Sequence, residues 1–464
     1  MASFNLPPVL RTVPAWVWAL LVVAHALVFG YAVRSGHYIF HDSGRYLQAA
    51  RNLRAHGQLY ARPWPWPSQP PQGAAVQEFT IRPPGYPLVI MGLGGATGRP
   101  VLLLLFQNAL SLVVLATVLG EAAATRVRPP SRRWWVAAVA LTLSFPAQLI
   151  YANAVMTEIP LQAVIMLGAG FGMKYAATHR PRYLAGAAGA LVAAWLLKPV
   201  WYPFSLVFLV VAGWEAWRRR RPLLALLGAL PLLLALAYMG WNWQRTGYFH
   251  FSSIADTNLL HYNAAGVVRQ TQGPASEDAW LDAVLRQADA QPTFAARQYT
   301  VQAAAAAVLQ QHPWRYAGQH IAGMATLFLD PGRYDFSTFW GLPDHVGLLS
   351  QLRSGGWPGI WGGLRQQPLG LLLVLGLVAG ANLLRLLLAG RGLARTTEDA
   401  LLGSWLRLAT PVGRWVAVGL LLYVALLTGP LGAARFLVPV WPLWLGLALR
   451  GVSTNHDSAT KPGI

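Results

Sequence analysis

The chain has 464 residues, of which 55% are hydrophobic and only 11% are charged, whereas soluble domains carry roughly 25% charged residues. Its net charge of +20 would suit a nucleic-acid-binding protein, but the basic residues form no single stripe, as such proteins require. The largest basic run, Arg218 to Arg221, lies between two apolar blocks, as in the cytoplasmic loops of membrane proteins. The absence of cysteine excludes disulfides and thiolate metal sites.

The first predicted element is a membrane span over residues 13–32, preceded by Arg11. This stretch is longer than a signal-peptide core of about 7–15 residues, so we expect it to be retained, with the N-terminus in the cytoplasm. An outer region over residues 34–98 follows, polar as far as Arg82 and ending in a short apolar piece, 87–96. Because that piece is too short to cross a bilayer comfortably, we expect it to be interfacial or re-entrant.

Apolar blocks of about twenty residues continue through the middle of the chain, and this length crosses a bilayer as a helix. We expect spans at 101–122, 134–151, 159–175, 183–197, 201–217 and 223–241. Turns with clustered arginines are assigned to the cytoplasmic side by the positive-inside rule, and tryptophans mark the interfaces. Residues 1–241 are therefore predicted to form an N-terminal transmembrane module, with 34–98 as its first outer loop.

A second long polar region is predicted over residues 242–368, with an amphipathic helix near 279–290 and an alanine-rich helix ending near Gln311. Its segment 317–329 is apolar but short. We expect C-terminal transmembrane helices within 369–450, namely 369–388, 415–427 and 437–449, and a cytoplasmic tail over 451–464.

The predicted fold class is an all-α polytopic membrane protein with about 10–11 transmembrane helices and two long periplasmic loop regions bearing short interfacial helices. Ten spans result if 317–329 lies flat and eleven if it crosses; the arginines of the 390–414 loop favour ten. No internal repeat is evident, which disfavours a transporter built from inverted repeats.

Only 16 residues are acidic, so carboxylates near span ends are informative. Asp42 begins a helical pattern through Leu47, Ala50 and Leu53, where it is either the N-cap of that helix or a general base in a pocket at the membrane surface. Glu158 follows the third span, where it either complements a helix N-terminus or serves a functional site.

Three cations lie at predicted outer boundaries, where cations are usually depleted: Arg82, Lys198 and Arg435. Each either extends toward water from an apolar surface or recognises a phosphate at the depth of the lipid headgroups. The outer histidines, including His261, show no metal-ligand spacing. Asp256 and Asn258 are typical of turns, with sugar binding as the alternative.

In combination, these residues resemble the glycosyltransferase C superfamily, in its polyprenyl-phosphate-sugar branch with lipid A aminoarabinose transferases and protein O-mannosyltransferases. The matching elements follow the family's order: Asp42 with Tyr46, Ala49, Leu53 and Gly57; Arg82, Pro83, Gly85 and Tyr86; Thr157 and Glu158; Lys198 and Pro199; and Arg435, Phe436 and Pro439. Ser43 stands where many relatives carry a second acid, which leaves participation of a divalent metal open.

The resemblance implies transfer of a sugar from a polyprenyl-phosphate carrier to an acceptor hydroxyl, with inversion, at the periplasmic face of a bacterial inner membrane. Asp42 and Glu158 would be catalytic, and Arg82, Lys198 and Arg435 would bind the donor phosphate. Tyr46, Tyr86, Asn258 and His261 are expected to contact substrate. The expected partners are the lipid-linked sugar donor, a glycan, lipid or protein acceptor and membrane lipids, without nucleic acid. A transporter or flippase of a lipid-linked sugar or phosphate lipid is the alternative.

Overall fold

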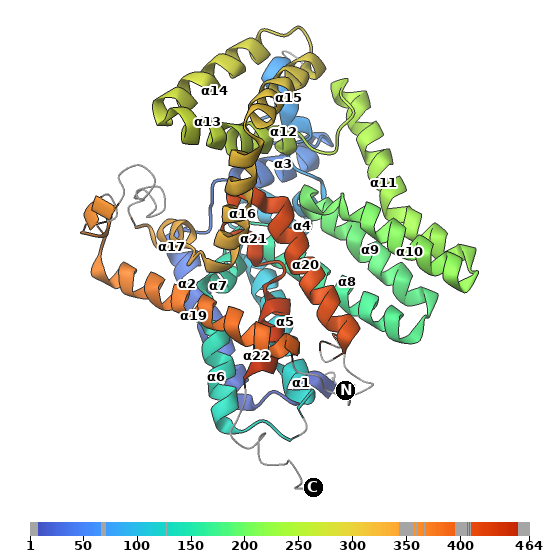
Figure 1. Ribbon diagram of the computed structural model, residues 1–464, viewed down its shortest axis with the longest axis vertical. Helices are drawn as coiled ribbons and strands as arrows, with labels where there is room; N and C mark the ends of the chain where they lie inside the picture. Colours follow the sequence, from blue (N-terminus) through green and yellow to red (C-terminus); the bar gives the residue numbers. More distant parts are fainter. Residues whose placement is uncertain are drawn as a thin grey trace.

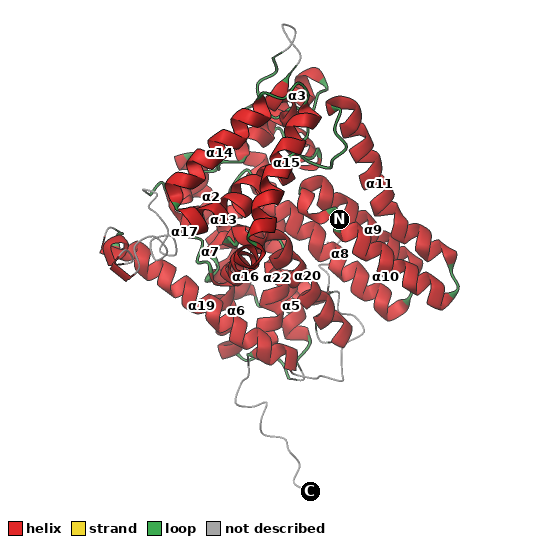
Figure 2. Ribbon diagram, turned by 45° about the horizontal axis from the view of Figure 1, so that its top comes forward, coloured by secondary structure: helices red, strands yellow, loops and turns green. Residues whose placement is uncertain are grey.

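A computed structural model describes residues 8–65, 71–126, 128–342, 357–358, 361–365, 367–394, 406, 408 and 410–452. Over these residues the chain consists of helices joined by loops, and no β-strand is present (Figure 2). The all-α prediction is therefore confirmed. The predicted tail from residue 453 onward, and most of the arginine loop between 395 and 409, lie outside the described residues.

Six helical stretches are long and apolar enough to cross a membrane. They are α2 (Ala15–Ser35), α5 (Val101–Ala124), residues Pro199–Arg219 with α10 (Phe204–Arg219), α11 (Pro222–Thr246), α19 (Leu369–Ala394), and residues Pro411–Leu431 with α20 (Pro411–Thr428). A seventh forms if α6 (Arg132–Leu143) and α7 (Pro146–Ala152), bent by 59°, count as one span. The polytopic prediction is confirmed.

The ten predicted spans all fall on helices, but three of these helices do not pass as spans by length and composition. The helix α9 (Pro181–Leu197) has 17 residues and α22 (Trp441–Gly451) has 11. The helix α8 (Glu158–Thr178) includes Glu158, Gln162 and Lys174, which lower its hydropathy. The sequence-based count of ten or eleven therefore exceeds the six or seven that the described helices support.

The bend between α6 and α7 has an identifiable cause. Pro146 begins α7 and cannot supply a backbone N–H to continue α6. The fully buried Arg385 of α19 donates to the Leu141 carbonyl, at 3.2 and 2.8 Å, and to Ser144 Oγ at 2.5 Å. Arg385 thus satisfies a carbonyl at the end of α6, where the helix dipole favours a cation.

Uncharged polar side chains tie several apolar helices together. His25 Nε2 lies 2.9 Å from Ser111 Oγ, to which Gln148 Nε2 donates at 2.8 Å. Gln148 and Gln162 exchange hydrogen bonds of 2.9 and 2.8 Å, and Gln162 Nε2 donates to the Val438 carbonyl at 2.5 Å. Because every member of such a network is satisfied, it fixes how α2, α5, α7, α8 and the segment near residue 438 sit together.

The two loop regions that were predicted to lie on the outer side fold into short helices. The first contains α3 (Ser43–His56), η1 (Gly73–Phe79), α4 (Gly85–Gly92) and η2 (Gly95–Thr97). The second contains α12 (Ile254–Asn258), the π-helix η4 (Leu259–Ala264), α13 (Ala265–Gln272), α14 (Pro274–Asp289), α15 (Phe294–Gln311), α16 (Pro313–Leu329) and α17 (Arg333–Trp340). The amphipathic and alanine-rich helices predicted from the sequence correspond to α14 and α15, and the apolar segment 317–329 to α16, which has 17 residues.

Two ends of the molecule can be distinguished in Figure 1. The helices α13, α14 and α15 lie at one end, which we call the outer end. The short helix α1 (Pro8–Arg11) and the turn between α5 and α6 lie at the other, and that turn carries Arg126 and Arg128. Between these ends, α4 lies against α9, where a Cβ on Gly85 would be 2.6 Å from the Leu196 carbonyl oxygen. Because Gly85 has no side chain, α4 can approach the end of α9 closely, and the segment that carries Arg82 lies near Lys198.

Candidate active site

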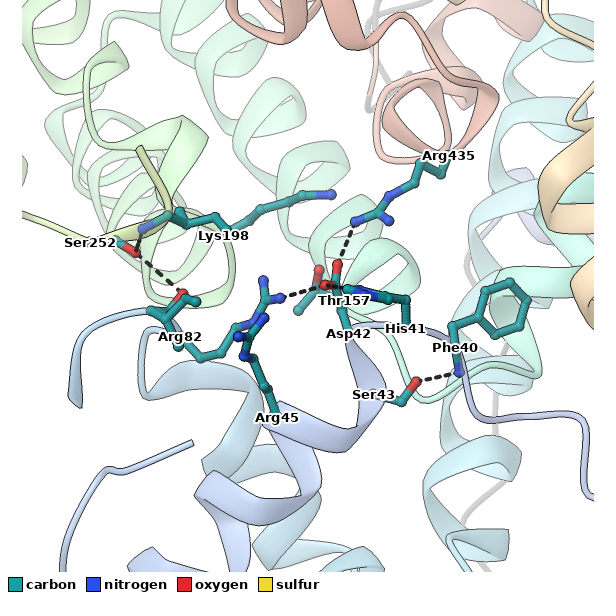
Figure 3. Close-up of polar contacts among 12 residues, drawn as sticks. Phe40, His41, Asp42, Ser43, Arg45, Arg82, Thr157, Lys198, Ser252 and Arg435 are labelled. Carbon is teal, nitrogen blue, oxygen red and sulfur yellow. Dashed lines mark hydrogen bonds and ion pairs between the residues drawn. The ribbon is translucent and has the colours of Figure 1, made fainter. Parts of the chain in front are cut away.

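Asp42 occupies the N-cap position of α3, but its carboxylate makes no hydrogen bond to the helix. It accepts instead from Arg82 Nη2 at 2.5 Å and from Arg435 Nη2 at 2.8 Å (Figure 3). Ser43, one residue later, organises the turn: its Oγ accepts from Phe40 N at 2.8 Å and donates to the Val155 carbonyl at 2.9 Å. Asp42 therefore stands at the cap position, but its side chain does not cap the helix.

Glu158 begins α8, and its side chain is completely buried. Lys198 Nζ donates to Glu158 Oε1 at 2.8 Å, and Arg435 Nε lies 3.8 Å from the same oxygen. The non-helical turn before Glu158 is held by two amide side chains of α5. Gln107 Nε2 donates to the Ala154 carbonyl at 2.8 Å, and Asn108 Nδ2 to the Ala152 carbonyl at 3.1 Å.

Five charged side chains thus form one network in which the sign alternates: Arg82, Asp42, Arg435, Glu158 and Lys198. They come from five segments far apart in the sequence, and Arg435 joins the two carboxylates. Three cations and two carboxylates give the network a net charge of +1. All five charged residues that the sequence nominated for chemistry therefore meet at one place.

Aromatic rings support the cations of this network. Lys198 Nζ and Arg435 Cζ each lie 4.9 Å from the ring centre of Phe436, so the ring contacts two cations. Arg82 Cζ lies 4.8 Å from the Tyr46 ring, which meets Tyr86 edge to face at 5.1 Å. These contacts restrict the cations to the positions from which they reach the two carboxylates.

The electrostatics keep Asp42 ionised. Burial alone would raise its pKa, but Arg82 and Arg435 outweigh that effect and hold the pKa of Asp42 well below its usual range. Burial lowers the pKa of Lys198, and the carboxylate of Glu158 opposes this shift. At neutral pH Asp42 is therefore an anion with two cationic partners, which makes it a weak base in this arrangement.

Two N–H groups in this network make no hydrogen bond among the described residues, although one of them, Arg435 Nε, lies 3.8 Å from Glu158 Oε1. The Nε atoms of Arg82 and Arg435 are buried and have no hydrogen-bond acceptor among the described residues. Buried polar groups are almost always hydrogen-bonded, and an exception calls for an explanation such as an absent ligand. Both atoms belong to residues that flank Asp42, so an anionic oxygen at this point would complete the site.

The remaining predicted substrate residues fall in two groups. Tyr46 lies in the network through Arg82, whereas Tyr86 is fully buried and donates its hydroxyl to Gln107 Oε1 at 2.7 Å. Asn258 ends α12 and His261 lies exposed on η4. No hydrogen bond or ion pair in the described part of the chain joins Asn258 or His261 to the five charged residues.

Two of the buried acids that sequence reasoning missed are Glu78 and Asp335. Glu78 is completely buried and pairs with Arg45 at 3.1 Å and Arg62 at 3.2 Å, which fastens the first outer loop. Asp335 of α17 accepts a 2.6 Å hydrogen bond from Tyr151. Neither residue lies in a recognisable motif, so only the long-range contacts reveal it. Over the described residues, no three His, Cys, Asp or Glu side chains are grouped as metal ligands.

An apolar groove of about 840 Å³ lies between α8, α9, α10 and α20, and it extends from Trp201 to Glu215 and Arg218 at the far end of α10. Its lining is mostly aliphatic and aromatic, and it includes Val164, Ala190, Val211, Trp415 and Leu422. Trp201 and Tyr423 also line it and contact one another at 5.1 Å, and Tyr423 donates to the Val200 carbonyl at 2.6 Å. Trp201 is three positions after Lys198, so this part of the groove lies next to the charged site.

Fold and site together define a polytopic membrane protein with a buried charged centre at the outer ends of its helices. Two similar solved structures are the arabinosyltransferase EmbB from Mycobacterium smegmatis (15% identity, TM-score 0.40) and ArnT from Cupriavidus metallidurans bound to undecaprenyl phosphate (17% identity, TM-score 0.36). Each similarity covers 94% of this chain, but 42% of EmbB and 77% of ArnT, so the chain spans less than half of EmbB.

No protein-family model matches the chain, and no curated protein sequence matches it. TM-scores below 0.5 describe a partial match in topology, so the chemistry proposed next rests on the residues of this chain.

Proposed function

We propose that the chain is a membrane glycosyltransferase that moves a sugar from a polyprenyl-phosphate carrier to an acceptor hydroxyl at the periplasmic face of a bacterial inner membrane. The observation that carries this proposal is the five-residue network with its net charge of +1 and its two guanidinium N–H groups that make no hydrogen bond. A polyprenyl phosphosugar is a phosphodiester with one negative charge, which matches that net charge. Guanidinium groups are well suited to bind its oxygens.

The groove supports a lipid-linked rather than a soluble donor. It is lined by apolar side chains and passes Trp201, close to Lys198. A phosphate held by Lys198 and Arg435 would therefore have an apolar surface beside it for the polyprenyl chain. The undecaprenyl phosphate bound to ArnT is a carrier of the same chemical class.

The proposed reaction is a displacement at the anomeric carbon. The acceptor oxygen attacks this carbon while the bond from carbon to phosphate oxygen breaks, and the electron pair stays on the phosphate. Asp42 takes the proton of the acceptor hydroxyl, and the configuration inverts. The phosphodiester becomes a monoester with additional negative charge, which Arg82, Lys198 and Arg435 stabilise.

Asp42 must lose a cationic partner before it can act as the base. In the structure Arg82 and Arg435 each bind one of its oxygens, which suppresses its basicity. We propose that the donor phosphate takes over hydrogen bonds from these arginines and so raises the basicity of Asp42 once the donor is bound. Glu158 holds Lys198 and Arg435 in place during this exchange.

The direct test is transfer from a panel of polyprenyl-phosphate sugars by the purified protein in detergent. Asp42→Asn should lower kcat about 10²–10⁴-fold, the usual contribution of a general base, while donor binding is kept or strengthened because the network gains positive charge. Asp282→Asn, an exposed acid on α14, is the matched control and should match wild type. Wild-type transfer by Asp42→Asn would refute the base assignment.

A lipid translocation assay separates the proposal from the transporter alternative. Vesicles that contain the protein and a fluorescent polyprenyl phosphate should show no protein-dependent translocation if the site serves transfer alone. Translocation without sugar transfer from any donor would favour the flippase.

A further inference from the structure

Asp335 is a third carboxyl group next to the charged network, and the proposed transfer step does not use it. It lies on α17, and its residue is 3% exposed. Tyr151 of α7, also fully buried, donates its hydroxyl to Asp335 Oδ1 at 2.6 Å. The two residues are 184 positions apart, so this contact is created by the packing of α17 on α7.

The segment that carries Asp335 is fastened to the segment that carries Arg435. Asp330 Oδ2 accepts from Ala434 N at 2.7 Å, one residue before Arg435, and Asp330 Oδ1 accepts from Gly332 N at 3.0 Å. α7 also packs against α21 (Ala434–Leu437). These contacts bring Tyr151 and Asp335 to the part of the molecule that holds Arg435. Tyr151 also contacts Phe40, two residues before Asp42, with 5.6 Å between the ring centres.

The charged and titratable groups that act on Asp335 come from three helices and one loop. They are Tyr151 of α7, Arg435 of α21, Asp330 before α17 and Glu158 of α8. Burial raises the pKa of Asp335 to about 7, the Tyr151 hydroxyl and Arg435 oppose the increase, and Asp330 and Glu158 add to it. Asp335 therefore changes charge within the physiological range.

We infer that Asp335 is a positioning residue that, through Tyr151 and Arg435, controls how strongly the site attracts the donor phosphate. With Asp335 neutral, three cations face two carboxylates and the net charge is +1. With Asp335 ionised, three cations face three carboxylates, the net charge is zero, and Arg435 has one more anion to neutralise. This inference rests on the proposed function, because it concerns the same phosphate site.

Protonation of Asp335 and binding of phosphate then reinforce each other. Since coupling between two binding events is reciprocal, phosphate that binds better to the neutral form must also favour uptake of a proton by Asp335. The affinity should fall as the pH rises through about 7, because the carboxylate appears there. A coupling of one pKa unit corresponds to about a tenfold change in affinity.

The experiment uses the full-length protein in nanodiscs and a polyprenyl methyl phosphate as the probe. This phosphodiester keeps a single negative charge across the pH range, whereas a phosphate monoester would itself titrate near pH 6. Calorimetric titrations at pH 6, 7 and 8, each in two buffers of different ionisation enthalpy, give both Kd and the number of protons taken up.

For the wild type, a coupling of one pKa unit should make Kd rise about fivefold from pH 6 to pH 8, part of the full tenfold change, with net proton uptake at pH 7. Asp335→Asn keeps an acceptor for the Tyr151 hydroxyl but cannot ionise, so it should bind tightly at every pH and lose this proton uptake. Tyr151→Phe removes a hydrogen bond that favours the ionised form of Asp335, so the midpoint of the pH dependence of Kd should move to higher pH. Asp256→Asn, a buried acid in the outer helices, should behave like the wild type.

Several outcomes would overturn the inference. One is an Asp335→Asn protein that is folded but keeps the wild-type pH dependence; His41, which lies 3.5 Å from Asp42, would then be the next group to test. If Asp335→Asn does not fold, the Tyr151→Phe variant decides. The inference is overturned if the pH dependence of Kd has the same midpoint in Tyr151→Phe as in the wild type. A wild type that binds the probe equally at all pH values overturns the inference alone, whereas one that binds it at no pH overturns the proposed function as well.

Discussion

Lys198 donates a 2.8 Å hydrogen bond to Glu158, whose carboxylate is completely shielded from solvent. Of the remaining neighbours, Arg435 Nε is 3.8 Å away and Thr157 Oγ1 is 3.5 Å away. Lys198 is thus the closest cationic partner of a buried charge. Removing one member of such a pair is far more costly than removing both, since it leaves an uncompensated charge in the protein interior.

Lys198→Met should therefore lower the free energy of unfolding by about 3–5 kcal/mol, the usual cost of breaking a buried pair. It should also weaken binding of a polyprenyl phosphate, because the network loses a cation. The double variant Lys198→Met with Glu158→Gln should regain much of the stability but not the binding. Chemical unfolding in detergent and lipid-binding titrations measure the two effects. Unchanged stability in Lys198→Met would contradict the burial of this pair.

Gly85→Ala should disturb the site from a distance. The added Cβ would lie 2.6 Å from the Leu196 carbonyl oxygen, so α4 must move away from the end of α9. We expect a stability loss of about 1–3 kcal/mol, typical of overpacking, and reduced transfer because Arg82 moves relative to Lys198. Gly92→Ala, in the same helix with open space around its Cα, is the control and should leave both quantities unchanged.

His250 should make the packing of the first outer loop sensitive to acid. Its Nε2 lies 2.8 Å from Thr80 Oγ1, its Nδ1 lies 2.7 Å from the Tyr248 carbonyl, and burial lowers its pKa to about 4. The unfolded chain binds a proton at His250 near pH 6.5, while the folded chain does so only near 4. Stability should therefore fall as the pH drops from about 6.5 to 4, by up to about 1.4 kcal/mol per pH unit.

Thermal unfolding of wild type and His250→Gln between pH 4 and 7 checks this prediction. The unfolding temperature of the wild type should exceed that of His250→Gln by a nearly constant amount above pH 6.5. Below pH 6.5 this excess should shrink steadily, because histidine titrates and glutamine does not. If the two unfolding temperatures differ by the same amount at every pH, the fold does not hold His250 neutral.

Much of the architecture could be predicted from the sequence, because apolar blocks of bilayer length have few alternatives to a helix. The boundaries were less predictable. Pro146 and Arg385 together turn one expected span into two bent helices, and that requires a contact between residues 241 and 244 positions apart. Likewise the hydropathy of the sequence predicts spans at α9 and α22, but α9 has 17 residues, the lower limit for a span, and α22 has 11.

The charged site was partly predictable. Asp42, Arg82, Glu158, Lys198 and Arg435 stand out as charges at span ends, where an isolated charge is costly. Their pairing could not be predicted, since Arg435 meets Asp42 across 393 positions. Asp335 gave no local signal, because its significance comes from Tyr151 and from burial. Asn258 and His261, chosen for their side chains alone, show no contact with the network among the described residues.

The groove beside Lys198 has one further consequence. Several of its lining side chains, including Val211, Trp415 and Leu422, are also exposed on the outside of the helices, so the groove opens sideways toward lipid. A donor that enters there arrives by two-dimensional diffusion within the leaflet, not from bulk water. The rate at which donor reaches the site then depends on its mole fraction among the lipids. Adding phospholipid while the total amount of donor is kept constant should therefore slow sugar transfer, because the donor is diluted within the membrane surface.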